Sequence, residues 1–188
     1  LRPTAWVDMN VWRALLWRVL GDMAARGGDA KAAARHAAQA AHTMELVDQL
    51  MWDERDGFYY DIDGRTHRKI RVKTPYNFMP LLWPGLRAER AERLVREHIF
   101  NPREFWCRHP LPSVSLDHPT FDPVNMFRGP TWVNQNWLVV EGLERQGFHR
   151  EARRLAWKTI ELVGPRYRGG RRVRSPRFYE WYHPHTGE

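Results

Sequence analysis

The chain has 188 residues, of which 43% are hydrophobic and 28% charged, a composition that excludes a disordered segment and indicates one globular domain over residues 1–188. The formal net charge of +8 raises the question of a nucleic-acid partner, but acidic residues are interleaved with the basic ones, so we expect no such partner. The one strongly basic run, residues 166–177, contains glycine and proline and is expected to be a solvated loop. No apolar run approaches the roughly 18 residues that a membrane-spanning helix needs. Cys107 is the single cysteine, which excludes an intrachain disulfide and favours a reducing compartment such as the cytoplasm.

Two long helices are predicted at the start of the chain. The first covers residues 4–26, is apolar on more than one face and ends at a glycine pair, so it should be buried among other helices. The second runs from its N-cap Asp29 to about residue 52 and carries a single apolar stripe. Residues 58–61 and 70–73 then predict a short β-hairpin closed around an Asp-Gly pair.

Helices also dominate the second half of the chain. A helix is expected over residues 87–99, followed by a long proline-rich loop over residues 101–130. Thr131 is expected to cap a mostly apolar helix that ends near Gln146, and an amphipathic helix should follow over residues 149–163. Apolar helices thus alternate with amphipathic ones, as an inner and an outer ring of helices require. We therefore predict an all-α fold, a two-ring α/α toroid with a short β-hairpin and a long proline-rich loop.

Three segments carry recognisable motifs: FWCRHPLPSVSL at residues 105–116, FRGPTWVNQNW at residues 127–137 and FYEWYHPHTG at residues 178–187. In this order they resemble glycoside hydrolase family 63, which includes processing α-glucosidases and bacterial hydrolases of mannosylglycerate and glucosylglycerate. The resemblance extends over almost the whole chain and is strongest with the small bacterial members. It implies a partial (α/α)6 toroid, the C-terminal part of a catalytic domain that lacks its N-terminal helices and its last helix.

The resemblance implies hydrolysis with inversion at the anomeric carbon and assigns Glu180 as the general base. Such hydrolysis needs two carboxyl groups about 6.5–9.5 Å apart, one protonating the leaving oxygen and one activating water. The family's general acid is an aspartate upstream of this chain, and Asp8 matches a segment downstream of that acid. In an extended segment, Phe178, Glu180 and Tyr182 would share one face, where the aromatic rings would partly desolvate the carboxylate. The residues alone favour the alternative, a surface glutamate paired with a nearby arginine such as Arg177, and the resemblance favours the general base.

Further substrate-binding residues are expected on the helix that follows the proline-rich loop. Trp132 and Asn136 are four residues apart and share one helix face, where an indole can stack on a pyranose and an amide can bind hydroxyl groups. The alternatives are core packing for Trp132 and capping of a backbone group for Asn136. Arg128 either binds a sugar hydroxyl or a carboxylate, or forms a structural salt bridge.

Three more residues complete the candidate site. Trp106, in the proline-rich loop, is expected either to wall the pocket or to pack within the loop. Asp8 lies near the start of an apolar helix and is costly to bury unpaired, so it either reaches the pocket or satisfies neighbouring backbone groups. Tyr182 is expected to face the substrate on the same side as Glu180.

We expect neither a metal nor a cofactor, because His109, His118, His183 and His185 match no zinc-ligand spacing. The predicted function is the general-base region of an inverting α-glycoside hydrolase that acts on a small glucosyl or mannosyl glycoside or on an oligosaccharide. The alternative is a non-catalytic, carbohydrate-binding helical module. Because the general acid lies outside the chain, the isolated chain should be inactive. An exposed apolar edge should also favour self-association.

Overall fold

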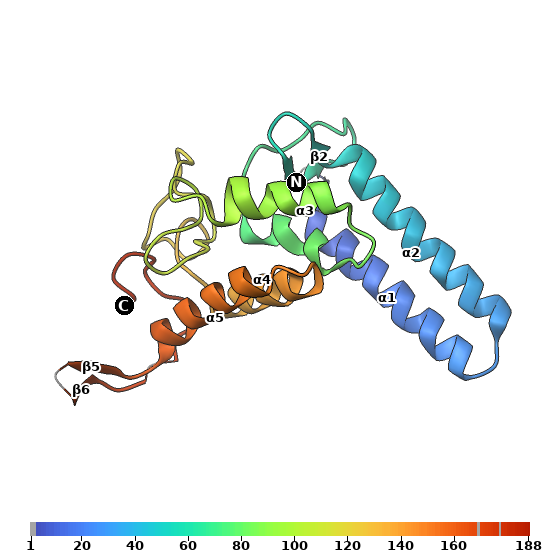
Figure 1. Ribbon diagram of the computed structural model, residues 1–188. Coiled ribbons are helices and arrows are strands. Elements are labelled where there is room, and N and C mark those ends of the chain that lie inside the picture. Colours follow the sequence, from blue (N-terminus) through green and yellow to red (C-terminus); the bar gives the residue numbers. More distant parts are fainter. Residues whose placement is uncertain (1–2, 169, 177) are drawn as a thin grey trace. The chain divides into compact units, whose positions relative to one another are not determined.

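Helices make up most of the secondary structure in the computed structural model, which describes residues 3–168, 170–176 and 178–188 (Figure 1). The chain forms two compact units, residues 1–71 and 72–188. Within the described ranges, no helix combines the length and the apolarity that crossing a bilayer requires. The prediction of a mainly helical fold is confirmed.

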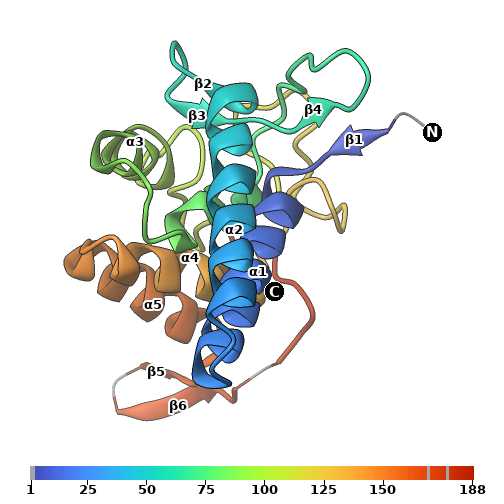
Figure 2. The same cartoon turned by 90° about the vertical axis from the view of Figure 1, so that its right-hand side faces the viewer.

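The first unit is built on two long helices, α1 (Val7–Arg26) and α2 (Ala30–Leu50), which run antiparallel and side by side in both views (Figures 1 and 2). Gly28, with a φ of +81°, closes the turn between them in a backbone conformation that favours glycine. The predicted N-cap at Asp29 is confirmed, because its carboxylate accepts a 2.9 Å hydrogen bond from the Ala32 N–H. The buried hydrophobic residues of the two helices are Val7, Val11, Ala14, Ala40, Met44 and Val47.

Short antiparallel strand pairs complete the first unit: β1 (Thr4–Ala5) with β4 (Ile62–Asp63), and β2 (Trp52–Asp53) with β3 (Phe58–Tyr59). The predicted pairing of residues 58–61 with residues 70–73 is confirmed only at its inner end, where the Ile70 N–H donates to the Asp61 carbonyl over 2.7 Å and Ile62 forms an antiparallel bridge with Lys69. For residues 58–59 the prediction is wrong, because they pair with residues 52–53. The cause is a tight turn just before β3, in which the Gly57 N–H donates to the Asp53 carbonyl over 2.8 Å. This turn directs residues 58–59 back onto the strand that precedes them.

The second unit begins with η1, a 3-10 helix at Pro75–Leu82, and with α3 (Ala88–Arg93), which continues as the π-helical segment η2 (Leu94–Ile99). The single helix predicted here is present in this two-part form. Phe78 of η1 packs edge to face against Phe105, with ring centroids 5.0 Å apart. This contact attaches the start of the proline-rich loop to the hydrophobic core of the unit.

Two consecutive helices, α4 (Val133–Arg145) and α5 (His149–Val163), follow the proline-rich loop. The predicted bounds of α5 are confirmed. The prediction that Thr131 caps α4 is wrong, because Trp132 occupies the N-cap position and Thr131 lies in extended backbone that pairs with two other segments. The helix consequently begins later than its sequence pattern indicates.

The basic run near the C-terminus forms a two-stranded antiparallel hairpin, β5 (Arg166–Arg168) with β6 (Arg171–Arg174), rather than the predicted solvated loop. Gly170, with a φ of +76°, lies in the turn between the strands. Gly170, one of the glycines that suggested a loop, thus lies in a tight connection between two extended segments.

Candidate active site

The three motif segments, which are far apart in the sequence, come together at Thr131 in the second unit. The Thr131 backbone pairs with Tyr182 through two hydrogen bonds of 2.8 and 2.9 Å. On its other side Thr131 forms an antiparallel bridge with Pro112, and the neighbouring Ser113 N–H donates to the Pro130 carbonyl over 2.9 Å. Residues of the first and third motifs therefore flank the second motif on either side.

Side chains reinforce this junction. The Thr131 hydroxyl donates to the His109 carbonyl over 2.8 Å, and the Gly129 N–H donates to the Ser113 hydroxyl over 2.9 Å. Gly129 has no room for a side chain, because a Cβ would lie 2.3 Å from the carbonyl oxygen of Asp122. The glycine of the Arg-Gly-Pro sequence is therefore required for the shape of the loop that carries the second motif.

Glu180 is exposed and lies two residues before the paired Tyr182. It lines a hollow of about 360 Å³ together with Tyr179, Trp181 and Glu188. Two of these residues, Glu180 and Glu188, are carboxylates. Arg177, the alternative partner considered for Glu180, lies outside the described residues.

The expectation that Phe178, Glu180 and Tyr182 share one face is wrong, because the segment is not a regular strand. Phe178 is 83% exposed whereas Tyr182 is only 1% exposed. The Tyr182 hydroxyl accepts a 2.8 Å hydrogen bond from the Tyr179 N–H, which folds the segment over the buried ring. Tyr182 thus holds the Glu180 segment through a hydrogen bond to Tyr179, and its ring does not line the hollow beside Glu180.

Trp132 is half-buried at the N-terminus of α4, and its indole N–H donates to the Met126 carbonyl over 3.2 Å. Phe127 lies parallel to the indole, with ring centroids 5.9 Å apart and an angle of 8° between the planes. Phe127 is 71% exposed, so the two rings form an aromatic step at the surface. Phe127 was not among the residues predicted for the site, although its position beside the Arg-Gly-Pro sequence of the second motif is a signal that points to it.

Asn136 does not share the exposed position of Trp132. It is fully buried, and its side-chain amide donates to the Thr159 hydroxyl of α5 over 2.9 Å. No described residue donates to the Asn136 side-chain oxygen. The side chain therefore lies in the interface between α4 and α5, where it contributes to helix packing.

The other predicted residues lie in different surroundings. Arg128 is exposed in the loop. Trp106 packs against Phe100 at a centroid distance of 4.3 Å, with the Arg154 guanidinium 5.1 Å from the Trp106 ring centre. Asp8 belongs to the first unit, where partial burial raises the pKa of its carboxyl above the usual value.

A buried charged network, which the sequence did not reveal, anchors the first motif. Glu104 accepts hydrogen bonds from the Lys73 ammonium over 2.7 Å and from the His98 ring over 2.6 Å. Burial alone would raise the pKa of Glu104, but these hydrogen bonds and the neighbouring charges outweigh it and hold the pKa below the usual value. The Glu104 carbonyl accepts from the Leu116 N–H, so the network is joined directly to the motif segment.

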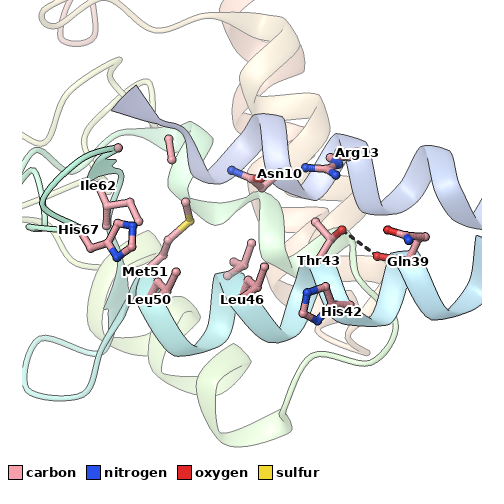
Figure 3. A pocket seen from close by; sticks show the side chains of 13 residues that line it. Asn10, Arg13, Gln39, His42, Thr43, Leu46, Leu50, Met51, Ile62 and His67 are labelled. Carbon is pink, nitrogen blue, oxygen red and sulfur yellow. Dashed lines mark hydrogen bonds between the residues drawn. The ribbon is translucent and has the colours of Figure 1, made fainter. Parts of the chain in front are cut away.

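Residues of the first unit line a separate hollow of about 280 Å³, shown in Figure 3. Its lining combines apolar side chains such as Leu46 with polar ones such as Asn10 and Arg13. None of the predicted site residues contributes to it. The described residues also contain no cluster of three or more histidine, cysteine or acidic side chains that could hold a metal ion.

Known proteins share both the sequence and the fold of this chain. Residues 4–188 match the family described as the mannosylglycerate hydrolase MGH1-like glycoside hydrolase domain. A mannosylglycerate hydrolase from Thermus thermophilus is 36% identical over 147 residues, which are 77% of this chain and 32% of that protein. The crystal structure of the GH63 mannosylglycerate hydrolase from another strain of Thermus thermophilus, in complex with glucose, has a TM-score of 0.80 and 30% identity, and the match covers 100% of this chain and 41% of that one.

The fold also extends to more distant relatives. The neutral trehalase Nth1 from Saccharomyces cerevisiae has a TM-score of 0.74 at 19% identity, over 85% of this chain and 31% of that one, which shows a shared fold alone. The chain spans between a quarter and a third of the length of the curated relatives it matches first. The resemblance carried by the three motifs is confirmed by these matches, and the chain belongs to the mannosylglycerate hydrolase MGH1-like glycoside hydrolase family.

Proposed function

We propose that this chain supplies the general-base half of the active site of an inverting α-glycoside hydrolase, within an (α/α)6 toroid, and that Glu180 is the base. The substrate class is a small glucosyl or mannosyl glycoside, with mannosylglycerate as the first candidate because the relatives named above hydrolyse it by name. The observation that carries the proposal is the backbone pairing of Thr131 with Tyr182, which brings the segment of Glu180 beside the segment of Trp132.

The chemistry follows from the roles of two carboxyl groups on opposite sides of the scissile bond. Glu180 takes a proton from a water molecule while the oxygen of that water attacks the anomeric carbon. The glycosidic bond breaks on the opposite face of the sugar. A carboxylic acid supplied by another part of the protein protonates the departing oxygen, so that water is added across the bond and the anomeric configuration inverts.

Substrate recognition is assigned to the groups around the second motif. The aromatic step formed by Phe127 and Trp132 offers an apolar face for a pyranose ring, and the indole N–H is already held by the Met126 carbonyl. The exposed guanidinium of Arg128 is available to a carboxylate such as that of a glycerate aglycone.

The hollow beside Glu180 is open to solvent, and the residues that line it are Tyr179, Glu180, Trp181 and Glu188. Hydrolysis by general acid and base requires an enclosed site in which water is positioned and charge is stabilised by fixed groups. We therefore assign the remaining walls of the pocket to other parts of the protein.

A chimera tests the proposal, in which residues 4–188 replace the matching part of the Thermus thermophilus mannosylglycerate hydrolase. Glu180→Gln should lower kcat on mannosylglycerate by about 10³-fold or more, because an amide cannot accept the proton. Glu188→Gln, which alters the other carboxylate of the same hollow, should retain activity within about threefold. Equal losses in the two variants, or an active Glu180→Gln chimera, would refute the assignment.

The exposed position of Glu180 favours one second candidate, a non-catalytic module that binds carbohydrate. In that case the Phe127 and Trp132 rings bind a sugar without turnover. The unsubstituted chimera distinguishes the two functions. A binding module would bind glucose in isothermal titration calorimetry but would not hydrolyse mannosylglycerate.

A further inference from the structure

The hollow of the first unit, with a volume of about 280 Å³, has no role in the proposed function. Its lining comes from α1, from α2 and from the segment around β4 (Figure 3). Val47, Met51 and Ile62 form a buried interior, each no more than 3% exposed, and Leu46 and Leu50 extend this apolar surface toward solvent. An apolar interior with an open mouth favours the burial of a hydrocarbon group.

The hollow is elongated along the two helices. On α2 its lining residues recur on successive turns from Gln39 to Met51, a stretch of helix that rises by about 18 Å. Asn10 and Arg13 of α1 face this row from the other side (Figure 3). The volume is at the lower end of the range for ligand pockets, so the shape suits one small, linear molecule.

The two ends of the hollow differ in charge. Figure 3 shows Arg13 and His42 at one end and Met51 and Ile62 at the other. Arg13 is exposed, and its guanidinium forms no ion pair within the described part of the chain. None of the described residues that line the hollow is acidic. The Arg13 end therefore suits an anionic head group, which a guanidinium binds through charge-assisted hydrogen bonds.

The turn at the apolar end is held in a conformation that is uncommon for its sequence. His67, which lines this end, has a φ of +55°, in the left-handed region that residues other than glycine seldom occupy. Its N–H donates to the Asp63 carbonyl over 2.9 Å, and the Asp63 carboxylate accepts from the N–H groups of Arg65 and Thr66 over 3.0 and 2.9 Å. Backbone of this kind persists only where its surroundings fix it, and it is concentrated at ligand-binding sites.

We propose that the hollow binds a linear, medium-chain aliphatic carboxylate. The carboxylate lies at Arg13, and the hydrocarbon chain lies along Leu46 and Leu50 toward Met51 and Ile62. An uncharged alcohol would leave the guanidinium without an anion, and a dicarboxylate would place its second charge against the apolar interior at a high cost. This inference does not rest on the proposed function, because none of the lining residues has a role assigned in hydrolysis.

Sodium octanoate is the probe, titrated into the 188-residue chain in a calorimeter. The expected result is one saturable site. Octan-1-ol has the same chain without the charge and sodium acetate has the same head without the chain, so each should bind at least about tenfold more weakly.

Arg13→Gln should weaken octanoate binding by about tenfold or more, because it removes the charge that faces the carboxylate. Arg35→Gln is the matched control, an exposed position on α2 that does not line the hollow. It removes the same charge from a chain of net charge +8, so it measures the general attraction of an anion and should change affinity by less than about twofold.

A second pair of variants locates the hydrocarbon chain. Leu46→Asn, at a position that is 41% exposed, should weaken octanoate binding by about fivefold or more. Leu16→Asn, at a position of α1 that is 59% exposed and outside the hollow, should leave the affinity unchanged. Circular dichroism should show the same helical content in all variants.

The absence of saturable octanoate binding overturns the inference, and so does equal affinity for octan-1-ol or for acetate. Equal losses in Arg13→Gln and Arg35→Gln overturn it by assigning the binding to net charge. Equal losses in Leu46→Asn and Leu16→Asn overturn it by assigning the binding to exposed apolar surface elsewhere.

Discussion

Glu104 is the buried carboxylate on which the first motif segment rests. Its side chain binds Lys73 and His98, while its backbone carbonyl accepts the Leu116 N–H. Lys73 is joined to the same segment through its own carbonyl, which accepts the Ser115 N–H over 3.0 Å. A single ionised residue thus links Lys73, His98 and the first motif segment.

The charge of Glu104 should make the stability of the second unit depend on pH. Its folded pKa lies below the ordinary value of 4.5, so the stabilisation is fully present above pH 4.5 and is lost as the pH falls through the lower folded pKa. Urea unfolding monitored between pH 7 and pH 3 should show this loss. Glu104→Gln should be less stable by about 3–5 kcal/mol at pH 7, because it removes the buried negative charge to which Lys73 and His98 are bonded. A variant with the same stability and the same pH profile as the parent would contradict this account.

The thiol of Cys107 should be unreactive in the folded chain. Burial raises the pKa of this thiol to about 11, and the Sγ atom donates a hydrogen bond to the His109 carbonyl over 3.0 Å. Because the thiolate is the reactive form, modification by an aromatic disulfide reagent at pH 8 should be about 100-fold slower than in the urea-unfolded chain. Rates that agree within a few-fold would show that the thiol is accessible and ionised.

The loop that carries the second motif depends on the absence of a side chain at Gly129. A Cβ there would overlap the Asp122 carbonyl at 2.3 Å, so Gly129→Ala should lower the free energy of unfolding by about 3 kcal/mol. Gly27→Ala is the control, because its added methyl group would meet atoms only at 3.5 Å and should change stability by less than about 1 kcal/mol. Thermal melts of both variants provide the comparison, and equal melting temperatures would remove the steric argument.

The helices could be predicted from the sequence, because their signals are local. The N-cap at Asp29 and the bounds of α5 follow from capping chemistry and apolar periodicity within a few turns. The strand pairs could not be predicted in the same way. Residues 58–59 pair with residues 52–53 because of the turn at Gly57. Thr131 lies outside α4 because its backbone pairs with Pro112 and Tyr182.

The candidate site was predictable in part, and the reason is again the range of the interactions. The motif residues Glu180 and Trp132 could be singled out because their types and spacing resemble a family. The burial of Asn136 depends on Thr159 of the next helix, which lies 23 residues away and so beyond the range of a local pattern. The contribution of Phe127 depends on the shape of a loop that no periodicity describes.

At the scale of the whole molecule, the hollow beside Glu180 is open to solvent. The proposed function requires further walls that enclose this hollow. The match to about 41% of a solved relative agrees with this description. Catalysis by the chain is therefore expected only in the presence of the complementary part.

The isolated chain should accordingly show no hydrolysis of mannosylglycerate or glucosylglycerate. Removing one member of an acid–base pair and leaving the site open to water eliminates general-acid assistance, which contributes about 10²–10⁴-fold, together with the electrostatic stabilisation of an enclosed site. Chromatographic detection of released hexose over a day is sufficient for this measurement. A rate that scales with the concentration of the purified chain would refute the expectation.

The most direct measurement concerns the nucleophile in the chimera that carries Glu180→Ala. Azide is already an anion and needs no general base, so it can replace the activated water when the base is missing. If Glu180 is the base, adding azide should restore cleavage of the α-glycoside and yield a β-glycosyl azide, identified by the proton NMR coupling or carbon shift of its anomeric centre. Unchanged inactivity in azide, in a chimera that is folded and active before the substitution, would contradict the assignment of Glu180, as would formation of the α-glycosyl azide.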